Sequence, residues 1–159
     1  MKILIVDDDP ISLKVIKVNL IKWGYEVQLA SGGEEAWEIV QGANPPRMII
    51  LDWMMKPVDG IEICKRIRED DEKRKTYIIL LSAKADKASV SQGLEAGADD
   101  YITKPFDREE LRARVRAAER MIELVDEAEE KAHELRELRK FKKEILELMA
   151  EKEAAKAKK

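Results

Sequence analysis

The chain has 159 residues, a length that suits one domain of ordinary size followed by a smaller appendage. Its formal net charge of −3 gives no sign of bulk nucleic-acid binding, and no apolar stretch approaches the roughly 20 residues of a membrane-spanning helix. The N-terminal "MKILIVDDD" lacks the long apolar region of a signal peptide, and one cysteine, Cys64, cannot form an internal disulfide. We therefore expect a cytoplasmic protein.

Five short segments rich in Ile, Val and Leu, each flanked by turn or charged residues, are typical of β-strands. They are residues 2–6, 25–30, 47–51, 77–82 and 100–103. The stretches between them have helical amphipathic patterns, at residues 11–22, 33–41, 59–69 and 87–95. Strands that alternate with helices predict an α/β fold, with parallel strands, right-handed crossovers and helices on both faces of the sheet.

Several residues mark the expected helix boundaries. Pro10 suits the first turn of a helix, because its missing N–H needs no partner there. The expected N-caps are Asp9, Ser31, Asp59 and Asp86, and the expected helix stops are Gly24 and Gly97.

The pattern changes after Pro105, since residues 106–159 contain neither glycine nor proline. Asp107 with Glu110 predicts a capping box at the start of a helix. Apolar residues then recur at spacings of three and four, with a slip or two in phase. They are Leu111, Val115, Ala118, Ile122, Val125, Ala128, Ala132, Leu135, Leu138, Phe141, Ile145 and Leu148.

This spacing, in a segment of which more than half is charged, predicts one long helix that buries a narrow stripe against a partner. A helix of about 45 residues is on the order of 70 Å long, too long to fold back on a small domain. We therefore predict a domain over residues 1–120 and a helical extension over 121–159. The extension is expected to form a parallel two-stranded coiled coil, with a solvated, partly frayed helix as the alternative.

Polar side chains follow the predicted strands. Asp7 and Asp8 come after the first strand, Asp52 after the third, Ser82 after the fourth and Lys104 after the fifth. The ligand site of an open α/β sheet lies beyond the carboxyl ends of its strands, so we expect these residues to converge.

Clustered carboxylates repel one another, and a hard divalent cation removes that cost. Mg²⁺, or Mn²⁺, prefers carboxylate, water and phosphate oxygens, so we expect direct bonds from Asp8 and Asp52 and a water-mediated bond from Asp7. Lys104 can pair with a carboxylate or a phosphoryl group, and Ser82 can donate to an added oxygen. Without a general base or a pocket motif, this set favours phosphorylation of Asp52 itself.

Four ordered segments closely resemble the receiver domain of two-component response regulators, the CheY-like family. They are "ILIVDDDP", "ILDWMMKPVDG", "ILLSAKAD" and "GADDYITKPF". The resemblance covers residues 2 to about 120 and implies a doubly wound sheet of five parallel strands in the order 2-1-3-4-5. It implies a histidine kinase or histidine phosphotransfer protein as partner, and no enzymatic activity beyond self-phosphorylation and slow self-dephosphorylation.

The resemblance also assigns roles to residues. Asp52 would be the phosphoacceptor, and Asp7 and Asp8 the acidic metal-site residues, with the backbone carbonyl of Met54 as a further ligand.

Three further positions follow from the same resemblance. Ser82 would be the switch hydroxyl, Lys104 the lysine that pairs with the phosphoryl group, and Tyr101 the aromatic residue that turns inward on activation. A cis bond is expected between Lys104 and Pro105.

The sequence departs from the family after Asp52. The family usually has proline four residues after the phosphoacceptor, where this chain has Lys56, and Pro57 comes one residue later. Met54 stands where many relatives carry a polar residue, and a thioether orients an attacking water poorly. With Lys84 two residues after Ser82, this predicts slow self-dephosphorylation.

Other functions were weighed against this one. A haloacid dehalogenase-type phosphatase needs a second aspartate two residues after the nucleophile, where Met54 stands. His133 in "HELR" resembles a kinase phosphoacceptor motif but lacks its other parts. An unphosphorylated dimerisation scaffold remains an alternative, as does a receiver fragment of a larger cyclase, kinase or phosphatase regulator. Charges of both signs are interleaved in the tail, which argues against direct nucleic-acid binding.

Overall fold

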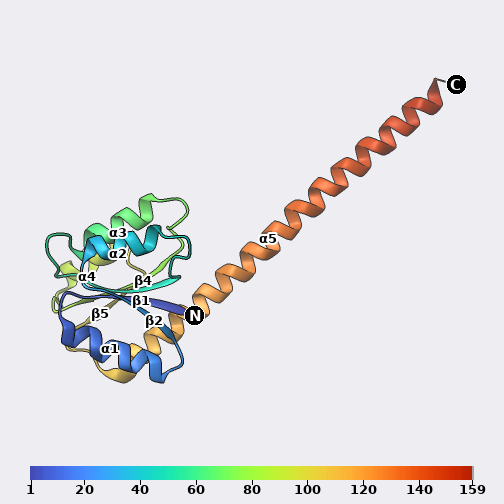
Figure 1. Cartoon of the computed structure of the whole chain (residues 1–159). Helices are drawn as coiled ribbons and strands as arrows, with labels where there is room; N and C mark the ends of the chain where they lie inside the picture. The colour runs from blue at the N-terminus through green and yellow to red at the C-terminus, as the bar shows by residue number, and fades with distance from the viewer. Residues whose placement is uncertain (159) are drawn as a thin grey trace. The chain divides into compact units, whose positions relative to one another are not determined.

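The computed structural model describes residues 1–158, and its elements follow the predicted order (Figure 1). The strands are β1 (Lys2–Val6), β2 (Glu26–Ala30), β3 (Met48–Asp52), β4 (Tyr77–Ser82) and β5 (Asp100–Thr103). The helices are α1 (Pro10–Lys22), α2 (Gly33–Gln41), α3 (Gly60–Glu69), α4 (Lys87–Glu95) and α5 (Arg108–Ala157). Within residues 1–158, no helix is both long and apolar enough to cross a membrane.

All strand pairs are parallel and the sheet order is β2-β1-β3-β4-β5, which confirms the predicted CheY-like fold. β3 is buried at all five positions, as its unbroken apolar sequence leads one to expect. In register, Val6 lies beside Leu51, Asp52 beside Leu81, and Ser82 beside Thr103. The carboxyl ends of β1, β3, β4 and β5 therefore lie along one edge of the sheet.

The core lies on both sides of this sheet. Figure 1 shows α1 on the opposite side of the sheet from α2 and α3. Leu4 and Ile49 belong to a buried cluster that includes Val40 of α2 and Ile63 of α3. Full burial of each such side chain contributes about 1.5–3 kcal/mol, so the packed faces hold the strand ends in place.

Most of the expected helix boundaries are confirmed. Asp9 caps α1 by accepting from the N–H groups of Ile11 and Ser12, and Pro10 is the first helical residue. Asp59 and Asp86 cap α3 and α4 in the same way.

The expectation that Ser31 caps α2 was wrong, because Gly32 occupies the N-cap position without a side-chain bond. The carboxylate of Glu35 reaches back instead and accepts from both the N–H and the hydroxyl of Ser31, at 2.8 and 2.9 Å. Ser31 is thereby fixed one residue before the cap.

The chain divides into two compact units, Met1–Glu119 and the residues from Arg120 onward, so the boundary falls inside α5. In the first unit, Leu111, Val115 and Ala118 are fully buried. In the second, large apolar side chains are exposed, for example Leu138 at 64% and Phe141 at 62%.

Candidate functional site

The site lies at the edge where four strands end. Asp52 and Ser82 are the last residues of β3 and β4, Asp7 follows β1, and Lys104 follows β5. Backbone bonds fix these ends, since the N–H of Lys104 donates to the carbonyl of Ser82 at 2.8 Å, and that of Trp53 to the carbonyl of Leu81 at 2.9 Å. The functional side chains therefore project from rigid strand ends.

Three carboxylates meet at this edge. One oxygen from each of Asp7, Asp8 and Asp52 lies within 4.8 Å of the others. Asp7 is 1% and Asp52 5% exposed, whereas Asp8 is exposed to solvent. Hard oxygen donors, with one side open to water, fit a Mg²⁺ or Mn²⁺ ion that keeps several waters of its own.

Lys104 joins the two buried carboxylates. Its Nζ donates to Asp7 Oδ2 at 2.8 Å and to Asp52 Oδ1 at 3.1 Å, and its side chain is 23% exposed. Burial alone would lower the pKa of Lys104, but its bonds to Asp7 and Asp52 outweigh burial and raise that pKa above its usual value. The lysine is therefore held charged between the acids.

The surroundings of Asp52, in contrast, disfavour its charged form. Burial raises the pKa of its carboxyl, the charge of Asp7 raises it further, and Lys104 opposes both without cancelling them. A cation, or a covalent group that removes the charge from this carboxylate, relieves part of that cost.

Asp7 is oriented by the turn into α1. The N–H of Asp9 donates to Asp7 Oδ1 at 2.9 Å, while the Asp9 carboxylate caps the helix. One turn therefore fixes both the helix start and the direction of Asp7. Sequence analysis identified the cap but not this bond, because nothing in the order Asp7, Asp8, Asp9 tells which oxygen a neighbouring N–H reaches.

A second group of contacts runs from Ser82 to Tyr101. Ser82 is fully buried, and its hydroxyl accepts from the N–H of Lys84 at 3.1 Å. The Tyr101 hydroxyl donates to the carbonyl of Lys84 at 2.6 Å, and Tyr101 is only 9% exposed. The described conformation therefore has Tyr101 inside.

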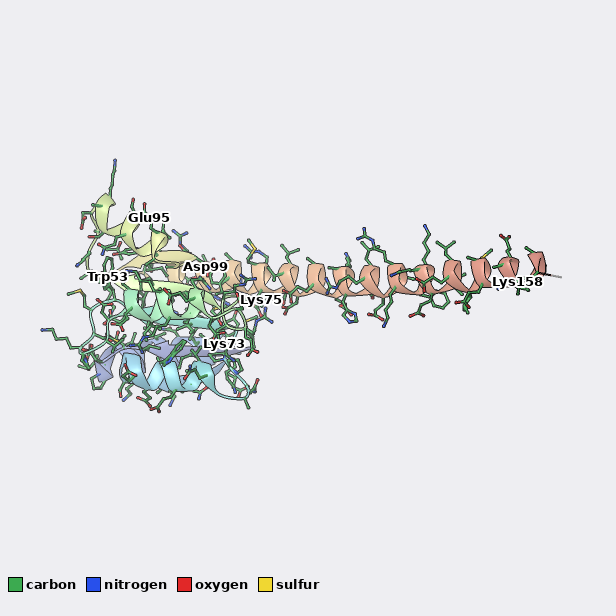
Figure 2. The ribbon with its side chains drawn as sticks, turned by 90° about the horizontal axis from the view of Figure 1, so that it is seen from above. Trp53, Lys73, Lys75, Glu95, Asp99 and Lys158 are labelled. Carbon is green, nitrogen blue, oxygen red and sulfur yellow. The ribbon has the colours of Figure 1, made fainter. Side chains whose placement is uncertain are left out.

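Trp53 completes this group. Its ring lies edge-on to Tyr101, with the centroids 6.3 Å apart, and the ammonium of Lys84 lies 4.5 Å from the Trp53 centroid. Figure 2 labels Trp53. Such a cation–π contact contributes about 0.5–2 kcal/mol. The sequence gave no signal for the pairing of Trp53 with Lys84, because the two residues are 31 positions apart in the chain.

The turn after Asp52 combines exposed and fixed residues. Met54 is 56% exposed, and it lines an open depression of about 430 Å³ together with Asp8, Lys56 and Pro57. The peptide bonds before Pro57 and before Pro105 are both cis.

Gly60 sets the distance between this turn and α3. A Cβ on Gly60 would collide with the backbone carbonyl of Asp52, and the Gly60 N–H donates to the carbonyl of Trp53 at 2.9 Å. Only glycine allows α3 to begin this close to the backbone at the end of β3.

Residues 3–116 match the family described as the response regulator receiver domain. The chain belongs to this family. It is 43% identical over 123 residues to the alkaline phosphatase synthesis transcriptional regulatory protein PhoP of Bacillus subtilis, covering 77% of this chain and 50% of that protein. It is 39% identical over 127 residues to the DNA-binding dual master transcriptional regulator RpaA of Synechocystis, covering 80% and 52%.

Solved structures agree with the receiver fold. The receiver domain of the Francisella response regulator 1452 has a TM-score of 0.68 and 36% identity, covering 74% of this chain and 94% of that one. The receiver domain therefore accounts for about three quarters of the chain, which spans about half the length of the curated relatives that it matches.

The structure thus brings most of the predicted site residues together in two groups. Asp7, Asp8, Asp52 and Lys104 form one cluster, and Ser82, Lys84 and Tyr101 form the adjoining one. His133 lies in the second unit, outside both clusters.

Proposed function

We propose that this receiver accepts a phosphoryl group on Asp52 from a histidine kinase or histidine phosphotransfer protein. The observation that carries the proposal is the buried Asp7–Lys104–Asp52 arrangement beside an exposed Asp8. It supplies a nucleophilic oxygen, a cation for the transferred group and oxygen donors for a metal, and it lacks any further catalytic base.

Transfer requires little from the protein beyond position and charge. The N–P bond of a phosphohistidine breaks while an oxygen of Asp52 bonds to phosphorus, and the released histidine nitrogen takes up a proton. Asp7, Asp8, Asp52 and the carbonyl of Met54 would hold Mg²⁺ or Mn²⁺, which neutralises charge on the phosphoryl oxygens when bound. Lys104, already within reach of Asp52, would turn its ammonium to a phosphoryl oxygen.

The response would pass from Ser82 to Tyr101. The Ser82 hydroxyl can donate to a phosphoryl oxygen while it accepts from Lys84, so attraction to that oxygen pulls on the segment 82–84. Tyr101 is bonded to the same segment through the carbonyl of Lys84. The phosphoryl group favours the arrangement in which Ser82 lies closer to it. Phosphorylation therefore shifts the equilibrium between two states of the segment 82–84 and Tyr101.

The lifetime of the phosphoryl group would be long. Met54 is exposed beside the carboxylates and offers no hydrogen bond to orient a water, and Lys84 is engaged on the ring of Trp53. Both features favour slow hydrolysis.

The donor would approach over α1 and the segment after β5. Ile11 is 73% and Val15 46% exposed, and with Phe106 they line an open depression of about 460 Å³ that reaches Lys104. An exposed apolar patch beside a reactive site is a favourable docking surface for the donor.

The second unit would act as the output by pairing two copies through α5. The exposed apolar residues of its helix support such a homodimer. The homodimer would act in the cytoplasm, and the acidic and basic residues interleaved along the helix disfavour direct contact with nucleic acid.

Acetyl phosphate with Mg²⁺, followed by intact mass measurement, tests the proposal. A single phosphoryl adduct is expected for the native chain, and none for Asp52→Ala or after chelation of the metal. No adduct on the native chain would leave the unphosphorylated scaffold as the better account. An adduct that persists in Asp52→Ala would show that another residue is the phosphoacceptor.

A further inference from the structure

The tail of α5 presents an apolar seam on a different face from the one that the helix buries. The buried residues are 0–4% exposed, and they are Leu111, Val115, Ala118 and Ile122. Met121 and Leu124 each come one residue before a position in phase with these buried residues. One residue corresponds to a rotation of about 100° around the helix axis, so the two residues lie on another face. Their exposures are 51% and 59%. The helix therefore has one buried face and one exposed apolar face.

From Met121 the exposed face repeats at alternating spacings of three and four without a slip. We call it the tail seam, and its members are Met121, Leu124, Ala128, Lys131, Leu135, Leu138, Lys142, Ile145, Met149 and Lys152. All ten residues are exposed, and seven are apolar. Figure 2 shows side chains standing out along the ribbon of α5 as far as Lys158. A strict seven-residue repeat is the pattern of a coiled coil.

The stripe expected from the sequence is buried from Leu111 to Ile122, and the tail seam is a different choice of face beyond that point. Ala132, Phe141 and Leu148 belong to the expected stripe and lie beside the seam.

We propose that the tail seam pairs with the same seam of a second copy in a parallel, in-register, two-stranded coiled coil. This inference rests on the proposed dimerisation through α5. It keeps the parallel, two-stranded arrangement expected from the sequence and adds the face and the register of the contact.

The residues that flank the seam support this direction. In a parallel in-register pair, the residue before every second seam layer faces the residue five positions later in the other helix. Glu134 then faces Arg139 of the second copy, which joins opposite charges, and Phe141 faces Leu146, which joins two apolar side chains. The other three such pairs each join a charged residue to an apolar one, so none sets like charges against each other. An antiparallel pair that sets Leu135 against Leu138 places Glu134 beside Phe141 instead, and loses both matches.

Two of the three lysines in the seam, Lys131 and Lys142, set the number of strands and the strength of the pairing. In a two-stranded coil the stems of Lys131 and Lys142 can lie along the interface while their ammonium groups reach water. A larger bundle encloses these positions more fully, which makes the charges costlier. In an in-register pair, each of these lysines also lies opposite the same lysine of the second copy. Repulsion between the two ammonium groups makes these two layers weaken the dimer.

Sedimentation velocity of the full chain over a range of concentrations tests the seam. Lys142→Leu is expected to tighten the dimer by about tenfold or more. Lys140→Leu is the matched control, because Lys140 lies two residues away on the opposite face of the helix, and it should change the dissociation constant less than about twofold. Equal effects of the two changes, or none from Lys142→Leu, would overturn the assigned face.

Direction and register need two further measurements. Leu124→Cys should oxidise to a cross-linked dimer, because only a parallel in-register pair sets these positions opposite each other, and the native Cys64 is fully buried. Glu134→Arg should weaken the dimer by about two- to tenfold, and adding Arg139→Glu should restore it. A dimer that fails to cross-link at residue 124 would overturn the parallel direction.

The same samples separate this inference from the proposed phosphorylation. A chain that remains monomeric in every variant but still forms the adduct on Asp52 would overturn the seam and leave the phosphoacceptor standing. A chain that pairs through the seam but forms no adduct would do the reverse.

Discussion

The two units of this chain use apolar residues in opposite ways. In residues 1–119, the Ile, Leu and Val of β1, β3, β4 and β5 are buried, and the buried carboxylates of Asp7 and Asp52 share the half-buried ammonium of Lys104. From residue 120 onward, apolar side chains such as Leu138 are exposed and charges surround them. The first unit buries its apolar residues within its own fold, whereas the second leaves apolar side chains exposed.

The largest expected difference between the units is the loss in free energy of unfolding when a leucine is changed to alanine. Leu51→Ala removes a side chain that is 0% exposed, so the free energy of unfolding should fall by about 2–5 kcal/mol. Leu138→Ala, at 64% exposure, should change it by less than about 0.5 kcal/mol at concentrations where the chain is monomeric. Urea denaturation monitored by tryptophan fluorescence gives both values. Equal losses would mean that the tail is packed as firmly as the sheet.

The next effect concerns the charges buried in the first unit. Lys104→Met leaves Asp7 and Asp52 facing each other without their shared cation, so the free energy of unfolding without Mg²⁺ should fall by about 1–3 kcal/mol. Added Mg²⁺ should recover much of this loss and stabilise the variant more than the native chain. Lys17→Met on the exposed surface of α1 is the control. A variant as stable as the native chain without metal would contradict the role given to Lys104.

A smaller, pH-dependent effect reports how α5 is held within the first unit. The Tyr25 hydroxyl donates to Glu119 at 2.7 Å, and burial with this contact raises the pKa of Tyr25 to about 12. As the pH rises above 10, unfolded chains ionise Tyr25 first, so the folded state loses stability until the pH reaches about 12. Tyr25→Phe should lack this part of the alkaline loss. Parallel stability curves for the two proteins between pH 9 and pH 12 would show that the contact is absent.

The smallest effect concerns the lifetime of the adduct. Met54→Asn supplies an amide that can orient a water beside Asp52, so the phosphoryl half-life should shorten by about two- to tenfold. Met121→Asn, the same change in the tail, should leave it unaltered. Decay of the adduct after removal of acetyl phosphate measures both. An unchanged half-life in Met54→Asn would remove Met54 from the control of hydrolysis.

Most of the fold of the first unit could be predicted because short-range sequence patterns determine its strands and helices. Short runs rich in Ile, Val and Leu predicted the strands, Asp9, Asp59 and Asp86 predicted the helix starts, and the strand ends predicted the carboxylate cluster. What escaped prediction depends on contacts between distant segments. Lys84 on Trp53 is one case, and the bonds from Arg68 to Gly97 and Asp99 that tie α3 to the start of β5 are another.

The second unit was predictable as a helix but not in its faces. Spacings of three and four fit several neighbouring stripes equally well when apolar residues are plentiful, so a stripe with slips could be drawn from Leu111 to Leu148. Burial distinguishes them only at the start of the tail, where Ile122 is 4% exposed and its neighbour Met121 is 51% exposed. Farther along, the residues of every face are exposed. The phase of a helix is set by what packs against it, which the sequence alone does not record.

The central claim is that chemistry at Asp52 controls pairing through α5. The most direct test is sedimentation of the full chain with Mg²⁺, before and after acetyl phosphate, with the adduct quantified by mass in the same sample. The account predicts a tighter dimer in proportion to the adduct, and no change for Asp52→Ala. A fully phosphorylated chain with an unaltered dissociation constant would contradict it.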